Sequence, residues 1–264
     1  KKQKTAFAME PSMKAPLMPV HIKPMVTEEP GMTCLEYFKQ DLTSLSLLKT
    51  SGAGTRRVKP IGVQEHILCT EGSMDLTYEG GSCRIVAGQG LLLQQHITVE
   101  CCCQGSFVLV SVAARVEEGM TAQPAIVEKV DVVDAPGITI SEHFGKVASH
   151  DPDFSLARAV VRGASEEAFQ APLFDEFVVC DEGSIEFLYG EGERLKIGVG
   201  EGVFLPKTLR VKWIWPESTQ YTVLCLPAFT PELSGREVED GTTVAKDSAS
   251  MAKLEALHAA TLTA

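Results

Sequence analysis

Apolar and polar residues alternate in short runs along most of the chain, and turns that contain glycine separate the runs. Residues 65–78, EHILCTEGSMDLTY, show the alternation, and the turns at 79–81 and 190–192 carry the glycines. A period of two is typical of strands that bury one face. Nothing between the runs is long enough for the crossover that joins parallel strands. The pattern therefore predicts an all-β fold of antiparallel strands, arranged as a small barrel or jelly roll.

The alternating pattern occurs twice. Residues 65–78 match EFVVCDEGSIEFLY at 176–189 with an offset of 111 residues. Farther along, AGQGLLLQQHITVEC from Ala87 matches VGEGVFLPKTLRVKW from Val199 with an offset of 112 residues. Upstream, PGMTCLEYF pairs with PGITISEHF. A repeat over matched strands predicts two copies of one structural unit.

The repeat divides the chain into five parts. We expect a β-barrel in each copy, a linker between the copies, and a different kind of segment at each end. The predicted parts are an arm at 1–29, a first barrel at 30–115, a linker at 116–135, a second barrel at 136–229, and a loop with a C-terminal helix at 230–264.

The two end segments do not follow the strand pattern. Residues 1–30 contain five prolines and four methionines without a helical or strand period, which predicts an extended arm suited to lie on another apolar surface. Near the C-terminus, apolar residues recur at steps of three and four, which predicts a short amphipathic helix. These residues are Met251, Leu254, Leu257, His258, Thr261 and Leu262. Such a short helix must dock, either on its own barrel or on a partner protein.

Composition excludes two classes of protein. The chain has 264 residues, 44 % hydrophobic and 22 % charged, and no run reaches the roughly 18 apolar residues of a membrane helix. We therefore expect no membrane-spanning segment. Asp and Glu outnumber Lys and Arg by 35 to 24, and the net charge of −11 predicts that nucleic acid is not a partner.

Eight cysteines are spread mostly through apolar runs rather than in CxxC pairs. This distribution predicts buried free thiols in a reducing compartment. Within the triplet at 101–103, Cys101 and Cys103 share one face of a strand, whereas Cys102 points to the other. Capture of a soft metal by this pair is the alternative.

Both copies resemble the cupin superfamily. Each has a Glu-x-x-[Val/Leu]-x-x-Glu-Gly stretch, a hairpin, and a Gly-x-Gly element, and GEGVFLPKTLRVKW in the second copy is the better match. The sequence is most similar to cupins of the ethanolamine-utilisation type, and two copies in one chain resemble a bicupin. The resemblance implies jelly-roll barrels. It leaves the function open, because cupins include isomerases, dioxygenases, decarboxylases, storage proteins and sugar-binding modules.

The resemblance also identifies where metal ligands would lie. Metal-binding cupins use two histidines before the motif glutamate, that glutamate, and a third histidine. The glutamate corresponds to Glu65 and Glu176, and the third histidine to Val99 and Val211. The preceding stretches RRVKPIGVQ and EAFQAPLFD contain no histidine. Because an alkyl group cannot ligate an ion, we expect no metal and no other cofactor.

Two histidines lie near the motifs of the first copy. His66 follows Glu65 directly, so the two side chains point to opposite faces of their strand. His96 aligns with Thr208, three residues before the ligand position, and is expected on the neighbouring turn. Neither histidine supplies the missing imidazole.

A metal-free pocket in the second barrel is one functional hypothesis. Its expected lining residues are Glu176, Tyr189, Lys212 and Trp213. Apolar neighbours, namely Phe177, Val179, Phe187, Phe204 and Trp213, would raise the pKa of Glu176 and allow it to act as a general base. No catalytic residue is assigned, because no nucleophile or acid accompanies it. A structural alternative is that Glu176 and Glu65, at the starts of their strands, bind backbone amides or a nearby arginine.

The two tryptophans also have a functional and a structural interpretation. Trp213 and Trp215 lie on one face of a predicted strand, with Ile214 on the other. They either stack on a sugar ring or pigment, or pack in the core or an interface.

The hypothesis that we favour from the sequence is a non-catalytic bicupin that is a structural or accessory subunit of a larger protein assembly. It would attach to other protein subunits through its N-terminal arm and C-terminal helix. The stretch TAFAM resembles the Ala-Phe-Ala junction of algal plastid leaders, which predicts the chloroplast and a photosynthetic complex, with the cytoplasm as the alternative. The other functional hypothesis is a metal-independent binding or enzymatic cupin that uses the second barrel.

Overall fold

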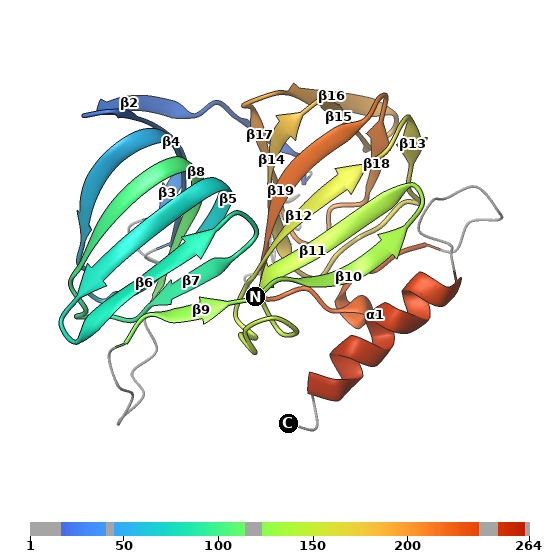
Figure 1. Ribbon diagram of the computed structural model, residues 1–264. Helices are drawn as coiled ribbons and strands as arrows, with labels where there is room; N and C mark the ends of the chain where they lie inside the picture. The colour runs from blue at the N-terminus through green and yellow to red at the C-terminus, as the bar shows by residue number, and fades with distance from the viewer. Residues whose placement is uncertain (1–16, 41–44, 114–122, 238–247, 262–264) are drawn as a thin grey trace, which may run out of the picture.

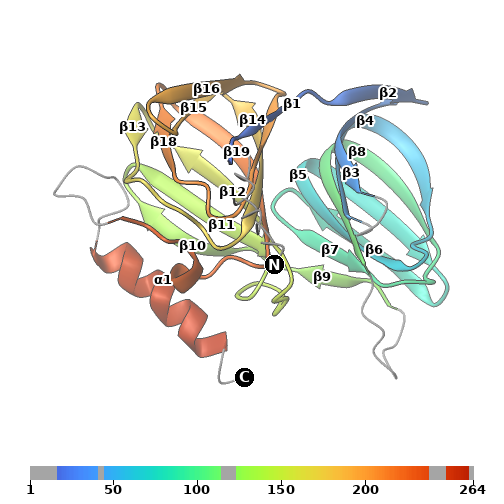
Figure 2. The same cartoon turned by 180° about the vertical axis from the view of Figure 1, so that it is seen from behind.

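Two β-barrels lie side by side, and a helix packs on the second of them (Figure 1, Figure 2). The computed structural model describes residues 17–40, 45–113, 123–237 and 248–261. The first barrel contains β2 (Met25–Glu29), β3 (Met32–Gln40), β4 (Leu45–Val58), β5 (Val63–Tyr78), β6 (Gly81–Val86), β7 (Gly90–Leu93), β8 (Val99–Ala113) and β9 (Ala125–Val127).

The second barrel has shorter strands. They are β1 (Val20–Ile22), β10 (Val130–Ala135), β11 (Ile138–Phe144), β12 (Ser155–Val161), β13 (Ser165–Glu166), β14 (Asp175–Glu182), β15 (Ser184–Tyr189), β16 (Glu193–Gly198), β17 (Gly202–Leu205), β18 (Val211–Trp215) and β19 (Thr219–Leu226). The helices among the described residues are η1 (Pro231–Leu233) and α1 (Ser248–Thr261).

The strands pair antiparallel throughout the described parts of the chain, as the alternating pattern predicts. The first barrel is one sheet in the order β2-β3-β4-β8-β5-β7-β9, with β6 paired to β5. The second barrel combines a seven-stranded sheet, β1-β17-β14-β19-β12-β11-β10, with a four-stranded sheet, β13-β18-β15-β16. The predicted all-β fold with two jelly-roll barrels, an extended arm and a short C-terminal helix is confirmed.

The two copies share backbone geometry as well as sequence. His96 and Thr208, which align in the repeat, both have left-handed backbone angles, with φ of 70° and 65°. The His96 N–H donates to the Pro60 carbonyl over 2.9 Å, and the Thr208 N–H donates to the Pro172 carbonyl over 2.6 Å. His96 therefore lies on the turn where the alignment predicts it.

The first barrel bends its long strands where the second barrel breaks them. Gly52, Gly105 and Gly72 lie side by side on β4, β8 and β5. A Cβ atom on Gly72 would lie 1.9 Å from the Gln104 carbonyl oxygen, so only glycine allows the strands to approach this closely. At the corresponding place in the second barrel, β14 ends at Glu182 and β15 begins at Ser184.

The facing sides of the barrels form one apolar cluster. Its buried members are Tyr37, Leu47, Leu68, Val108 and Val110 from the first barrel, with Phe144, Phe154, Leu156, Phe177, Val179 and Leu224 from the second. His66 lies in this junction, 1 % exposed, with its ring 4.5 Å from that of Phe154. Burial lowers its pKa to about 3. Since Glu65 lines a cavity on the other side of β5, the predicted opposite orientation of the two side chains is confirmed.

The arm and the segment between the barrels both cross this junction. β1 pairs with β17 of the second barrel, and β2 then pairs with β3 of the first. Within the predicted linker, 116–135, β9 pairs with β7 and β10 pairs with β11. Each crossing segment therefore contributes strands to both barrels. Residues 1–16 of the arm, with the TAFAM stretch, lie outside the described residues.

The C-terminal helix α1 packs on its own barrel, against β10 and η1 (Figure 1). Leu254 and His258 from the predicted apolar face are buried, and Leu257 and Thr261 are half-buried. The other two predicted members of this face, Met251 and Leu262, have no described side chains. The described part of the helix therefore docks within the molecule.

The cysteines are free thiols, as expected, and most of them are buried. All eight are free, six of them are buried, Cys83 is half-buried and Cys102 is exposed. Cys101 and Cys103 share the buried face of β8, as predicted. Within the described part of the chain, no helix is long and apolar enough to span a bilayer.

Candidate functional site

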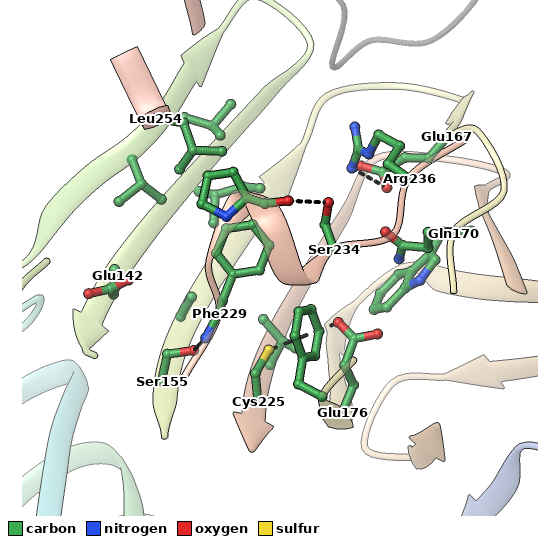
Figure 3. Close-up of a pocket in the computed structure, with 18 of the residues that line it drawn as sticks. Glu142, Ser155, Glu167, Gln170, Glu176, Cys225, Phe229, Ser234, Arg236 and Leu254 are labelled. Atoms are coloured by element: carbon green, nitrogen blue, oxygen red, sulfur yellow. Dashed lines mark hydrogen bonds and ion pairs between the residues drawn. The ribbon is translucent and has the colours of Figure 1, made fainter. Parts of the chain in front are cut away.

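A cavity of about 130 Å³ lies inside the second barrel, between Glu176 and the C-terminal segment (Figure 3). Its walls are mostly apolar side chains from β10, β11, β18 and β19. Phe229, Pro231, Ser234 and Arg236 from the segment after β19, together with Leu254 of α1, complete the lining. The helix thus forms part of the cavity wall.

Strand alternation positions Glu176 inside the barrel. Along β14, Glu176 lines the cavity, whereas Phe177 and Val179 point to the junction with the first barrel. Phe204 packs against that same junction cluster. The prediction that Phe177, Val179 and Phe204 line the pocket around Glu176 is therefore wrong, because neighbouring residues of a strand face opposite ways.

The same alternation separates the other predicted lining residues. On β18, Trp213 lines the cavity, whereas Lys212 points away and its Nζ lies 2.7 Å from Glu166 Oε1. Tyr189 packs at the edge of the barrel core and does not reach the cavity lining. Of the four expected residues, the structure brings together Glu176 and Trp213. Trp213 and Trp215 share one buried face, with ring centres 6.1 Å apart.

Glu176 is the unusual group of the cavity. Its side chain is buried, and its Oε1 lies 4.0 Å from Cys225 Sγ. Within the described part of the chain, its Oε2 atom has no hydrogen-bond partner. Burial and, to a smaller extent, the negative charge of Glu167 raise the pKa of Glu176 to about 8, against the opposing effect of Arg236. The predicted direction of the pKa shift is thus found. A carboxyl with this pKa is mostly protonated at about pH 7 and can donate a hydrogen bond.

Most other polar groups around the cavity have partners. Arg236 Nη2 lies 2.8 Å from Glu167 Oε2. The Glu142 carboxylate accepts hydrogen bonds from the backbone N–H groups of Val147 and Ala148, over 2.7 and 2.9 Å.

Two buried polar atoms of the lining residues remain without a hydrogen-bond partner in the described structure, namely Glu176 Oε2 and Trp213 Nε1. Buried polar atoms are usually satisfied, so these two are candidates for contacts with a ligand.

The donor set does not fit a divalent metal ion. The third-ligand positions, Val99 and Val211, are fully buried alkyl groups. The cavity lining contains no histidine, and Glu142 and Glu167 are already bound to backbone amides and to Arg236. No group of three metal-binding side chains converges among the described residues. Glu176 alone cannot hold an ion beside a cationic guanidinium.

Sequence reasoning missed several lining residues. Glu142 could have been found, because it aligns with Glu36 in the repeat. Glu167, Cys225 and Arg236 carried no motif, and only the fold brings them to Glu176. In the first barrel, a cavity of about 240 Å³ is lined by Glu36, Ser46, Leu48, Arg56, Glu65, Leu109 and Ser111.

Solved structures with the same arrangement of barrels are distant in sequence. A mutant of Bacillus subtilis oxalate decarboxylase superposes with a TM-score of 0.62 and 10 % identity, over 82 % of this chain and 79 % of that chain. A second oxalate decarboxylase structure superposes with a TM-score of 0.65 and 10 % identity, over 83 % and 81 %. A glyoxylate-induced protein of Pseudomonas aeruginosa superposes with a TM-score of 0.57 and 10 % identity, over 82 % and 92 %. This chain has a bicupin fold.

Sequence comparison adds little to the fold. No family model matches the chain. A curated relative, the endoribonuclease YbeY of Myxococcus xanthus, is 32 % identical over 103 residues. The match spans 38 % of this chain and 35 % of the relative, so the chain covers about a third of that relative's length. The superposition on these structures establishes the fold. At 10 % identity it does not establish the function, which has to be argued from the cavity.

Proposed function

We propose that this bicupin binds a small neutral molecule in its second barrel without a metal ion. The observation that carries the proposal is a ligand-sized, mostly apolar cavity that contains two buried polar atoms without partners, Glu176 Oε2 and Trp213 Nε1. Pockets of this kind, apolar with few convergent polar groups, are typical of small-molecule sites.

The polar groups define the class of ligand. Protonated Glu176 and the indole N–H of Trp213 are both hydrogen-bond donors, so they suit an oxygen acceptor such as a ketone, ester or amide. Arg236 is neutralised by Glu167, which leaves no free cation to attract a carboxylate ligand. A dry cavity of about 150 Å³ accommodates benzene in another protein. The ligand is therefore a neutral, mostly apolar molecule of about the size of benzene.

Binding is favoured over catalysis by the same groups. A general base must be ionised, whereas Glu176 is mostly protonated at about pH 7. Glu142 and Glu167 are held by other partners and do not form a second acid–base group beside it. The resemblance to ethanolamine-utilisation-type cupins remains a prediction. The net charge of −11 does not favour an RNA partner.

The proposal is tested by thermal denaturation and native mass spectrometry with three compounds of similar size: cyclohexanone, methylcyclohexane and cyclohexanecarboxylate. We expect cyclohexanone to bind and to raise the melting temperature, because it alone is neutral and carries an acceptor. Glu176→Leu, which replaces the carboxyl group with an apolar side chain of similar size, should abolish this effect, whereas Glu65→Gln in the first barrel should not. Equal binding of all three compounds, or unchanged binding by Glu176→Leu, would contradict the proposal.

A role as an accessory subunit is the second candidate, and the arm favours it. Five apolar side chains of the arm are about half exposed, with relative exposures of 50–59 %: Leu17, Met18, Val20, Met25 and Val26. We propose that these exposed side chains of the arm contact another protein subunit. The docking of α1 on its own barrel withdraws its buried face from such a role. A plastid photosynthetic complex and the chloroplast remain proposals from the TAFAM stretch.

Replacing Leu17, Met18, Met25 and Val26 by serine tests this second role. The barrels should stay folded, because these side chains are exposed, while the native complex should dissociate on gel filtration of the source extract. Serine at Ile61 and Leu173, which are exposed elsewhere, is the matched control. A complex of unchanged size with the arm variant would rule the role out.

A further inference from the structure

The C-terminal segment closes the cavity of the second barrel. Leu254 lines the cavity from α1, and it is 5 % exposed. On its other side, α1 presents exposed residues such as Lys253 and Glu255 to solvent. Figure 3 shows Leu254 across the cavity from Glu176. Access to the cavity from this side therefore requires the helix to move.

His258 lies one helical turn after Leu254, on the same face of α1. It is 4 % exposed, and its ring packs edge-on against Phe229, with 5.8 Å between the ring centres. Neither Nδ1 nor Nε2 has a hydrogen-bond partner among the residues that the structure describes. A neutral imidazole already loses hydration in this place, and an imidazolium would bury a charge without an acceptor for either N–H.

Charges on the elements around His258 do not compensate for its burial. Glu232 of η1 attracts the imidazolium, whereas Lys146, in the turn after β11, repels it. From β10, Asp131 is bound to Lys129 and Ser141 and interacts with Lys253 of α1. Burial is the largest effect, and the pKa of His258 is lowered.

We propose that α1 is an acid-sensitive lid on the second-barrel cavity and that His258 is its latch. The inference rests on the proposed function for the meaning of the cavity, and it adds how that cavity is opened. With the helix docked, His258 is neutral and packs on Phe229. When the ring takes up a proton, the helix leaves the barrel so that the charged ring is hydrated, and Leu254 leaves the cavity wall with it.

The direction of the pH effect follows from the lowered pKa. The docked form binds fewer protons than the undocked form, whose histidine has a pKa of about 6.5. Docking is therefore fully favourable above about pH 6.5 and weakens as the pH falls towards the lower pKa of the docked form. Burial also lowers the pKa values of His66 and His143, to about 3 and about 4, so a response to acid from either of them would persist in a variant without His258.

Quenching of tryptophan fluorescence by acrylamide tests the lid without any ligand. The chain has two tryptophans, both buried in the second barrel, and Trp213 lines the cavity. For the full-length protein we expect the quenching constant to rise at least about twofold between about pH 7.5 and pH 5.5, across the titration range of histidine. Far-UV circular dichroism should show unchanged strand content over the same range.

Matched variants identify the group that titrates. His258→Phe keeps an aromatic ring against Phe229 but cannot be protonated, so its quenching should stay low at both pH values. In His258→Lys the lid should be open at both pH values, so its quenching should be high at both. His150→Asn is the control, because His150 is exposed and its φ of 58° suits asparagine. This control should respond to pH like the wild type.

The outcomes separate the lid from the ligand. A pH-independent wild type, or an acid response that persists in His258→Phe, would overturn the lid. If His258→Phe fails to fold, hydrogen exchange of α1 in the wild type at the two pH values decides: unchanged protection overturns the lid. A lid that opens on acidification in a protein that binds no neutral ketone would contradict the proposed function alone.

Discussion

In the first barrel, Glu65 faces a cavity that it shares with Arg56 and Ser111; in the second, Glu176 faces one that it shares with Cys225. Both glutamates come from the same position of the repeat. On the neighbouring strand, Ser111 lies opposite Glu65 and Cys225 lies opposite Glu176. Burial raises the pKa of both carboxyl groups; Arg56 opposes the shift at Glu65, whereas at Glu176 the negative charge of Glu167 adds to the shift and Arg236 opposes it. The same motif glutamate therefore meets a cation in one barrel, and a second carboxylate together with a cation in the other.

The two cavities also differ in the segments that cover them. The first cavity is lined by residues of β3, β4, β5 and β8, whereas the second also receives five residues from the C-terminal segment. The extra cover removes water from around Glu176, and the loss of hydration raises its pKa. The comparison teaches that the chemistry of a cupin-like barrel depends on what covers its mouth, and not on the motif glutamate alone.

The largest effect that would sharpen this comparison concerns the cores. Trp213 aligns with Cys101 in the repeat, and both are nearly fully buried. We expect Trp213→Ala to lower the free energy of unfolding by about 3–5 kcal/mol, because it leaves a large cavity. Cys101→Ala, at the matched position, should cost about 1 kcal/mol. Chemical denaturation measures both, and equal losses would show that the second barrel does not depend on its aromatic core.

The bend of the first barrel provides the next test. Gly105 has a φ of +136°, and a Cβ atom there would lie 2.0 Å from the Glu71 carbonyl oxygen. Gly105→Ala should therefore cost roughly 3 kcal/mol, from backbone strain and displaced strands. Gly62 also has a positive φ but open space around it, so Gly62→Ala should cost about 1 kcal/mol. A tolerated Gly105→Ala in denaturation experiments would mean that the strands bend by other means.

The two motif glutamates should respond differently to pH. The folded-state pKa of Glu176, about 8, lies above its ordinary value of 4.5. The stability that protonated Glu176 contributes is complete below about pH 4.5 and is lost progressively between about pH 4.5 and about pH 8, by up to about 1.4 kcal/mol per pH unit. Glu176→Gln should remove this loss and stabilise the protein by about 2 kcal/mol at about pH 8, since its own buried amide offsets part of the gain.

Glu65→Gln is the matched control for this pH effect. It removes the negative partner of Arg56, so we expect no stabilisation at alkaline pH. Denaturation curves at several pH values distinguish the two variants, and a wild type whose stability does not fall between about pH 5 and pH 8 would refute the assignment of Glu176 as a buried acid.

The smallest expected effect concerns one hydrogen bond between the barrels. The Tyr37 hydroxyl of β3 donates to the Gly200 carbonyl, in the turn before β17, over 3.1 Å. Tyr37→Phe should lower the free energy of unfolding by about 1 kcal/mol, since it leaves that carbonyl without this donor. Tyr78→Phe, within the first barrel, is the comparison variant. If only the Tyr37 variant unfolds in two steps, this bond contributes to the joint unfolding of the barrels.

Much of the architecture could be predicted because it depends on local patterns. The period of two in stretches such as 65–78 predicts strands, and their recurrence at 176–189 predicts a second barrel. The helix over Leu254 and His258 likewise follows from their spacing. By contrast, the prediction that Glu176 and Phe177 share one pocket is wrong, because alternation along β14 points them to opposite faces.

The sequence by itself determined the strand pattern, the repeat, the buried thiols, and the position of one glutamate in each barrel. These properties depend on residues within a few positions of one another, or on matching two such stretches. Only the tertiary structure decided which groups meet Glu176. Glu167, Cys225 and Arg236 come from separate segments, and α1 returns from the end of the chain to cover them. Hydration and charge, which set the protonation of Glu176, depend on these long-range contacts, and no local pattern contains them.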